Sequence, residues 1–313
     1  MARFLLHRLA VAVPVMFVVA TLTFFLVQLV PGDPASFILG GSASAEQIQQ
    51  LHEKLGLNQS VPAQYVTWLT DAVRGDFGDS FVSGTSARLS VLQALPVTVS
   101  VAVMTTLITL VVGIFLGVLA AARGGTADRV IQGACSLGMA IPNFWLAVLL
   151  IWALAVKAKL FPATDYVPLT QSPGQWLLHV LLPALSISVG TLGQVVFQTR
   201  AAAKEVLARE YIRTLRAAGI PQRRILFKHV LRNAAIPVTT VLGITFIFTL
   251  GGVVVIEAIF NLPGLGYLML QSVSTHDLSV VQAGVIFFSL VVVLANLVTD
   301  TITTWLDPRV RVA

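Results

Sequence analysis

The residues able to act as nucleophiles, acid–base groups or metal ligands are few in this sequence, and they are widely separated. One cysteine, Cys135, excludes an internal disulfide and a cysteine-based metal site, and the five histidines form no pair at ligand spacing. A phosphate-binding loop needs Gly-Lys followed by Ser or Thr, but none of the five lysines follows a glycine. The patterns G-x-S-x-G and H-E-x-x-H do not occur either. We therefore predict that the chain is not an enzyme and has no cofactor or metal of its own.

A basic stretch from about residue 199 to residue 236 is too highly charged to cross a membrane, yet its pattern is helical. Apolar residues recur at i, i+4, i+8 and i+11, on one face of a helix: Leu207, Tyr211, Leu215 and Ala218. Arg209, Arg213 and Arg216 follow another face. Gly219 suits the left-handed residue that ends a helix, and Pro221 prevents its continuation. We expect a short amphipathic helix over about residues 208–218.

Three functions fit a basic amphipathic helix of this kind. It can lie on anionic lipid, which its basic face would favour. It can be a solvated loop that only reports membrane topology. It can also fit into a cleft of another cytoplasmic protein and pass movement to the membrane helices. The residue pattern alone leaves these three open.

Polar residues inside the apolar segments are the other candidates for function. Five of them are candidates to line a substrate path: Gln28, Asn143, Gln194, Glu257 and Asn296. Hydrogen bonding between helices explains such residues equally well, and Glu257 at the outer end of its segment is expected to face water or substrate. Few charges approach the apolar segments, which disfavours an ion-coupled secondary transporter.

The elements that must position these residues are membrane-spanning helices. Hydrophobic residues make up 56% of the chain and charged residues 11%, against about 25% charged in a soluble domain. Six segments reach the roughly 20 apolar residues that a span requires. They cover about residues 9–30, 96–122, 130–156, 176–198, 233–256 and 279–305. We predict an all-α polytopic protein that forms one transmembrane domain over residues 1–313, with the first segment as a retained anchor. Gly113 and Gly117 are spaced for close packing of helices.

The distribution of Lys and Arg predicts the orientation. With the N-terminus in the cytoplasm, 15 of the 20 basic residues fall on the inner side. Six spans then place both termini inside, residues 31–95 outside and residues 199–232 in the cytoplasm. The net charge of +6 therefore reflects the membrane topology of the chain, and we expect no nucleic-acid partner.

The outer segment, residues 31–95, is predicted to contain short helices. Ser44 can cap a helix with Gln47 three residues on, and Gly56 can end it. A second helix is expected to start near Pro62 and to present Tyr65 and Trp68 to an apolar surface. These pieces form either a cap on the outer mouth or a layer at the membrane interface.

The ordered motifs along the chain resemble those of a known transporter family. The runs are Tyr211 to Gly219 (YIRTLRAAG) and Leu231 to Pro237 (LRNAAIP), Pro31 to Pro34 (PGDP), Gly75 to Ser80 (GDFGDS), Leu95 to Thr98 (LPVT), Pro263 to Gly266 (PGLG) and Leu306 to Arg311 (LDPRVR). Together they are similar to permeases of ATP-binding-cassette importers, in the dipeptide, oligopeptide and nickel group. The chain departs from the wider family at Arg213-Thr214-Leu215, where a Glu-Ala-Ala opening is usual.

The resemblance implies a type I importer permease in the inner membrane of a prokaryote. It implies a second homologous permease, two cytoplasmic ATPase subunits that bind ATP and Mg²⁺, an extracytoplasmic substrate-binding protein and surrounding lipid. Five residues are assigned by it to ATPase coupling: Tyr211, Ile212, Arg213, Arg216 and Gly219. The expected substrate is a di- or oligopeptide, and the alternative is a nickel chelate or another small solute.

Overall fold

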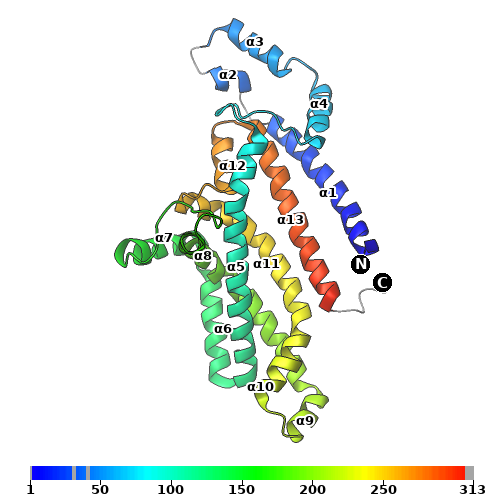
Figure 1. Ribbon diagram of the computed structural model, residues 1–313, viewed down its shortest axis with the longest axis vertical. Helices are drawn as coiled ribbons and strands as arrows, with labels where there is room; N and C mark the ends of the chain where they lie inside the picture. The colour runs from blue at the N-terminus through cyan, green and yellow to red at the C-terminus, as the bar shows by residue number, and fades with distance from the viewer. Residues whose placement is uncertain (1, 30–32, 40–42, 307–313) are drawn as a thin grey trace. The chain divides into compact units, whose positions relative to one another are not determined.

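The computed structural model describes residues 2–29, 33–39 and 43–306, and within these ranges the regular elements are helices (Figure 1). In chain order they are α1 (Ala2–Gln28), α2 (Pro34–Leu39), α3 (Ala45–Leu55), α4 (Val61–Val73), α5 (Ala87–Arg123), α6 (Gly125–Ala140), α7 (Asn143–Leu150), the π-helix η1 (Ile151–Lys157), α8 (Pro173–Ala208), α9 (Glu210–Ala217), α10 (Gln222–Arg224), the π-helix η2 (Ile225–Val230), α11 (Leu231–Phe260), α12 (Leu265–Ser274) and α13 (Leu278–Leu306). Two predicted motifs reach beyond these ranges: Pro31 and Gly32 of the first, and residues 307–311 of the last, lie outside the described residues.

The described residues contain five helices long and apolar enough to cross a membrane, and six when one bent pair is counted as a span. The five are the Ala10–Gln28 part of α1, α5, α8, the continuous stretch Gln222–Phe260, and α13. All six predicted segments therefore correspond to helical structure. The fourth is longer than expected, because α8 continues to Ala208.

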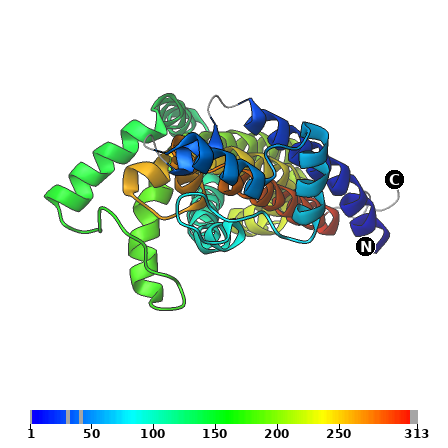
Figure 2. The same cartoon turned by 90° about the horizontal axis from the view of Figure 1, so that it is seen from above.

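The third predicted span, residues 130–156, is not one straight helix. The chain bends by 95° between α6 and the α7–η1 pair (Figure 2). Ile141 at the break is extended, with φ −83° and ψ 124°. The ring of Pro142 disfavours helical geometry at the residue before it and supplies no N–H, which accounts for the break.

The chain divides into two compact units. Unit 1 comprises Met1–Pro96 and Gly264–Val293, and unit 2 comprises Val97–Pro263 and Leu294–Ala313. Both α5 and α13 contribute residues to each unit.

Unit 1 contains the predicted short helices. Ser44 and Gln47 form a reciprocal capping box on α3, and Gly56 ends that helix in the left-handed region with φ 68°. Both features were expected from the residue types. Burial opposes ionisation of Asp33, but hydrogen bonds from Ser36 and His52 outweigh it and lower the pKa of this carboxyl below its ordinary value.

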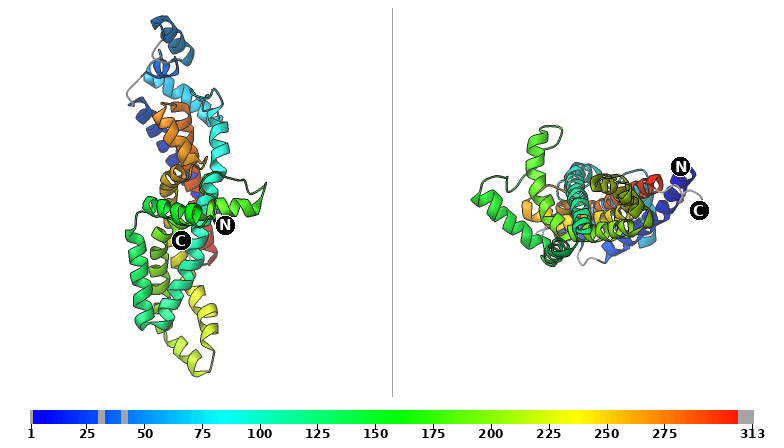
Figure 3. Two further views of the ribbon diagram at one scale, coloured as in Figure 1. Left: turned by 90° about the vertical axis from the view of Figure 1, so that its left-hand side faces the viewer. Right: turned by 90° about the horizontal axis from the view of Figure 1, so that it is seen from below.

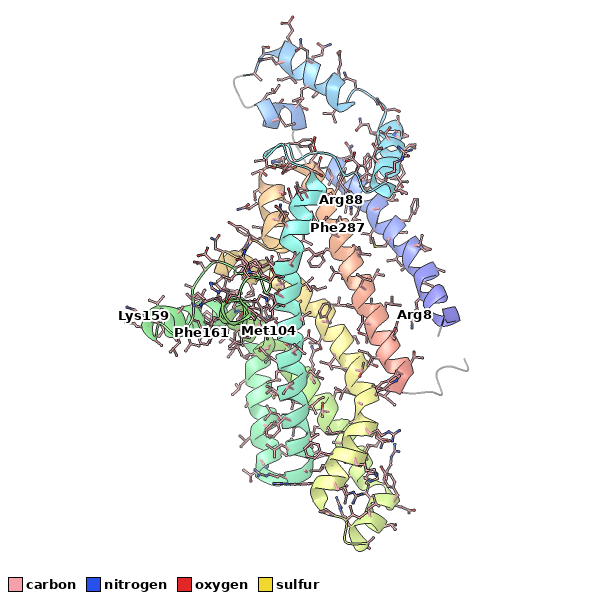
Figure 4. All side chains as sticks on the ribbon, viewed as in Figure 1. Arg8, Arg88, Met104, Lys159, Phe161 and Phe287 are labelled. Carbon is pink, nitrogen blue, oxygen red and sulfur yellow. The ribbon has the colours of Figure 1, made fainter. Side chains whose placement is uncertain are left out.

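Helix α4 begins where predicted, with proline in its first turn, and it packs on α1. The ring of Phe24 on α1 lies 5.3 Å from the rings of both Tyr65 and Trp68. The core of unit 1 also joins the 76–86 segment to α5, α12 and α13. Phe77, for example, meets the ring of Phe287 at 5.8 Å; Phe287 is labelled in Figure 4.

Unit 2 is built around α8, which packs against α6, α7 and α11. Close approach depends on small residues. A Cβ placed on Gly117 would lie 2.5 Å from Cβ of Thr199, and one on Gly113 would lie 2.7 Å from Cγ1 of Val195. The predicted close packing at these two glycines is confirmed. In this unit α9 and α10 lie at the same end as the turn between α5 and α6 (Figures 1 and 3).

Candidate functional site

The predicted amphipathic helix exists as α9, and its two ends have clear causes. Arg209 is extended, with φ −67° and ψ 145°, and separates α9 from α8. At the other end Gly219 has φ 74°, the N–H of Gly219 donates to the carbonyl of Arg216 at 3.0 Å, and the N–H of Ile220 donates to that of Leu215 at 3.1 Å. These two bonds form a Schellman motif. The left-handed role expected for Gly219 is confirmed.

The buried face of α9 agrees with the predicted one only in part: Leu207 and Leu215 pack against the buried cluster beneath the helix, whereas Tyr211 and Ala218 are exposed. Ile212 is fully buried among Ala203 and Val206 of α8 and Ile225 and Val230 of η2. Tyr211, expected on the apolar face, is 39% exposed. The predicted face joined Leu207 to α9 as though one helix ran through both. The break at Arg209 resets the helical phase, so that Ile212 becomes the anchor.

The outer surface of α9 and of the segment that follows it is basic. Tyr211, Arg213, Arg216 and Gly219 are all exposed on or beside α9. Further cations are exposed nearby, at Arg209, Arg223, Arg224, Lys228 and Arg232. Phe227 stands among them and is 72% exposed. A partner surface that is acidic with an apolar pocket would complement this patch.

A charged cluster that the sequence pattern did not reveal lies close to α9. Asp128, in the first turn of α6, has a side chain that is only 8% exposed. Its carboxylate accepts from Nε and Nη2 of Arg200 at 2.5 and 2.7 Å, from Nζ of Lys204 at 2.7 Å, and from Nε2 of Gln132 at 3.0 Å. The sequence offers one hint, a lone carboxylate between Arg123 and Arg129 in a basic stretch, but this hint does not identify the partners of Asp128.

Two of the five candidate path residues lie where α7, α8 and α11 meet. Asn143 begins α7, and its Oδ1 occupies the space that a Cβ on Gly190 of α8 would fill. Its Nδ2 would be 3.8 Å from a Cβ on Gly252 of α11. Gln194 is exposed on α8, and its Oε1 accepts from Oγ1 of Thr245 on α11 at 3.4 Å.

The expectation that Glu257 faces water or substrate is wrong. Its side chain is fully buried in unit 2, and it accepts a hydrogen bond from Oγ1 of Thr98 at 2.6 Å. Ionisable groups at membrane depth face the bundle interior and bond to neighbours, because lipid does not solvate them. Glu257 therefore joins α11 to α5.

The remaining path candidates are in other places. Asn296 is exposed on the part of α13 that belongs to unit 2. Gln28 belongs to unit 1, where its Nε2 donates to Oε1 of Gln64 at 3.3 Å. Gln28 and Gln64 line one open cavity of about 420 Å³, together with Trp68 and Asp71. Asn143 and Gln194 share the junction of α7, α8 and α11, where Asn143 lies against Gly190, one turn before Gln194 on α8.

Comparison with known proteins agrees with this architecture. The family described as "Binding-protein-dependent transport system inner membrane component" matches residues 113–312. The family described as the N-terminal part of such membrane components matches residues 1–102.

Named relatives match over nearly the full chain. A putative peptide transport system permease protein of Brucella abortus (strain 2308) is 40% identical over 312 residues, covering 99% of each chain. The oligopeptide transport system permease protein AppB of Bacillus subtilis (strain 168) is 35% identical, covering 99% of this chain and all of its own. The glutathione transport system permease protein GsiC of Escherichia coli (strain K12) is also 35% identical, covering 99% of each chain.

A solved structure supports the fold. A chain of the inward-facing MetNI methionine ABC transporter superimposes with a TM-score of 0.58 at 18% identity, covering 70% of this chain and 97% of that one. Together these findings identify the fold as that of a type I importer permease. The family implies ATPase and substrate-binding partners for the chain. The chain belongs to the family of binding-protein-dependent transport system inner membrane components, and it is a multi-pass inner-membrane permease subunit of a prokaryotic ATP-binding-cassette importer whose ATP hydrolysis takes place in separate subunits.

Proposed function

We propose that this chain forms half of the translocation path of an importer for di- or oligopeptides. A second, related permease supplies the other half, so that the membrane assembly is a heterodimer. The names of three relatives support the substrate class, since they refer to peptides, oligopeptides and glutathione. Nickel chelates are the alternative cargo of the wider group, and uptake assays with both solutes distinguish the two.

In this proposal the N- and C-termini and α9 face the cytoplasm. The exposed cations on and beside α9 support that orientation, since Lys and Arg collect on the cytoplasmic side of membrane proteins. Residues 31–95, which include α2, α3 and α4, then lie outside, where the substrate-binding protein delivers its load.

Helix α9 is the element that couples the permease to ATP. Each of two ATPase subunits, holding ATP and Mg²⁺, receives the coupling helix of one permease. Tyr211, Arg213 and Arg216 contact the ATPase from the exposed face of α9, while the buried Ile212 keeps the helix seated on α8. The single observation that carries this assignment is the position of α9. It is seated on α8 by one buried side chain and has its polar face uncovered.

ATP acts on a membrane element with two states, and the loaded binding protein acts on the same element. When ATP closes the ATPase pair, the two coupling helices move together and the path opens outward. Hydrolysis and product release return the path to its inward-facing state. Asn143 and Gln194 line the path on the side of this chain, at the junction of α7, α8 and α11.

Replacing Gly219 tests the coupling role of α9. A β-branched residue resists positive φ, at a cost on the order of 1–2 kcal/mol, whereas asparagine tolerates it. A Cβ at Gly219 would meet nothing within 4 Å, so the strain is confined to the backbone at the end of α9. We expect Gly219→Val to insert normally but to hydrolyse ATP with little peptide uptake, and Gly219→Asn to stay coupled.

The assay is peptide uptake per ATP hydrolysed by the complex in proteoliposomes. Fully coupled transport by Gly219→Val, at normal expression, would contradict the role of α9. Uptake that continues without ATP and collapses with the ion gradient would identify a secondary transporter instead.

A further inference from the structure

Helix α9 is attached to α8 in a way that prevents it from moving alone. One residue, Arg209, separates the two helices. Ile212 of α9 has no exposed surface and lies among Ala203 and Val206 of α8. A displacement of α9 therefore shifts the end of α8.

The same end of α8 is held to α6 by the Asp128 cluster. Arg200 and Lys204 lie one turn apart on α8, and both donate to the carboxylate of Asp128 at 2.5–2.7 Å. Arg200 binds through two nitrogens, which fixes the angle of the guanidinium as well as its distance. Gln132, one turn further along α6, donates to the same carboxylate and orients it.

From this cluster onward, α6 and α8 stay in contact up to the bend. A Cβ on Gly138 of α6 would lie 3.1 Å from Cγ1 of Val189 on α8, and a Cβ on Gly193 would overlap the side chain of Met139. These contacts leave no gap in which one helix can slide freely past the other. At the far end lies the bend at Ile141–Pro142, followed by Asn143.

The charge balance of the cluster gives Asp128 a specific part. Two cations, with side chains 24% and 42% exposed, share one carboxylate that is 8% exposed. Arg200 and Lys204 are four residues apart on one helix face, where like charges repel. Without Asp128 these two side chains would be driven apart and away from α6. A buried ion pair is weak evidence for stability, so a role for this cluster is sought in the geometry of the two helices that it joins.

We propose that Asp128 is a positioning residue for coupling. By holding Arg200 and Lys204 it makes α6 and the end of α8 a single lever, so that movement of α9 reaches the bend at Ile141–Pro142 and the side chain of Asn143. The inference rests on the proposed function, because it requires that an ATPase moves α9.

The test uses the whole importer in proteoliposomes and measures peptide uptake per ATP hydrolysed. Asp128→Asn keeps the size of the side chain but removes its charge. We expect it to lower uptake per ATP by about 5-fold or more, the range of ordinary allosteric coupling, while ATP hydrolysis continues. The charge reversal Asp128→Arg with Arg200→Asp, combined with Lys204→Gln so that no cation is left facing the new arginine, restores one pair of opposite charges between the two helices and is expected to recover coupling.

The matched control is Glu205→Gln on α8, which breaks an exposed pair with Arg209, 2.9 Å away at the residue that caps this helix. Its uptake per ATP should equal that of the unaltered complex. If the Asp128 ion pair had only a structural role, Asp128→Asn would lower the amount of assembled complex without changing the uptake per ATP.

Unchanged uptake per ATP in Asp128→Asn would overturn the inference. Where that variant does not assemble, the charge-reversed pair decides: an assembled and coupled complex supports the lever, and an assembled but uncoupled one refutes it. Absence of ATP-dependent uptake in the unaltered complex and in Glu205→Gln would refute the proposed function itself.

Discussion

Asp277 is the buried acceptor that fixes the tip of the 76–86 segment in unit 1. It is 3% exposed, and it accepts from Oγ of Ser80 at 2.5 Å and from the N–H of Phe81 at 3.2 Å. Oγ of Ser80 in turn accepts from the N–H groups of Val82 and Ser83 at 3.3 and 3.0 Å. One carboxylate thus holds a row of backbone donors in place. This segment lies on the side that the proposed function assigns to the binding protein.

We predict that Asp277→Ala loosens this segment. Loss of the acceptor leaves the Ser80 hydroxyl and the Phe81 amide unsatisfied, at a cost of about 1–3 kcal/mol for each group that stays buried. Limited proteolysis of the purified chain should cut residues 76–86 faster, and the melting temperature should fall.

The matched control for that change is Asp79→Asn, because Asp79 is exposed in the same segment. It should leave both the cleavage rate and the melting temperature unchanged. Equal cleavage of Asp277→Ala and the unaltered chain would contradict the role given to Asp277.

At the scale of helices, glycine decides how closely α5 approaches α8. A Cβ on Gly117 would lie 2.5 Å from Cβ of Thr199 and 2.9 Å from the carbonyl oxygen of Val196. A Cβ on Gly133 of α6, in contrast, would meet nothing within 4 Å. The two glycines therefore offer a matched comparison between packing and helix propensity.

Gly117→Ala is expected to destabilise the chain by about 1–3 kcal/mol, since α5 and α8 must separate to admit the methyl group. Gly133→Ala should be neutral or slightly stabilising, because alanine favours the helix and has room there. Thermal unfolding of both variants in the same detergent measures the difference. Equal melting temperatures would show that the helices do not depend on this contact.

Local chemistry made several elements predictable from the sequence. The Ser44–Gln47 capping box, the left-handed Gly56 and the left-handed Gly219 depend only on neighbouring residues, and all three are confirmed. A proline such as Pro142 can kink or start a helix, but the 95° bend that divides the predicted span 130–156 was not expected, because hydropathy is averaged over about 19 residues and membrane helices tolerate proline. The short helix predicted to start at about residue 208 starts at Glu210, but the apolar spacing continues smoothly across Arg209 and therefore placed Tyr211 on the buried face.

Contacts between residues far apart in the chain could not be predicted from the spacing of residue types in the sequence. Asp128 and Arg200 are 72 positions apart, and nothing in either local stretch reveals that they meet. Glu257 and Thr98 are 159 positions apart, and their hydrogen bond turned a residue expected to face water into a buried one. Of the five residues that the family resemblance assigns to ATPase coupling, Tyr211, Arg213, Arg216 and Gly219 are exposed, whereas Ile212 is buried beneath α9.

At the scale of the whole molecule, the chain is a permease subunit of an importer whose ATP hydrolysis takes place in separate subunits, so the energy for transport reaches it through contact with another protein. The family to which it belongs consists of inner membrane components of binding-protein-dependent transport systems. The exposed, basic face of α9 is the surface that we propose for the contact. Asp128, Arg200 and Lys204 would then carry the movement towards the membrane.

The most direct measurement is purification of the chain from its native membrane in mild detergent, with mass spectrometry of the proteins that accompany it. The unaltered chain is compared with a triple variant of the exposed α9 face, Tyr211→Ala with Arg213→Ala and Arg216→Ala. We predict that the unaltered chain brings a second permease and ATPase subunits, whereas the triple variant keeps the second permease and loses the ATPases. Full retention of the ATPases by the triple variant would contradict the coupling role of α9, and recovery of the unaltered chain alone would contradict the proposed assembly.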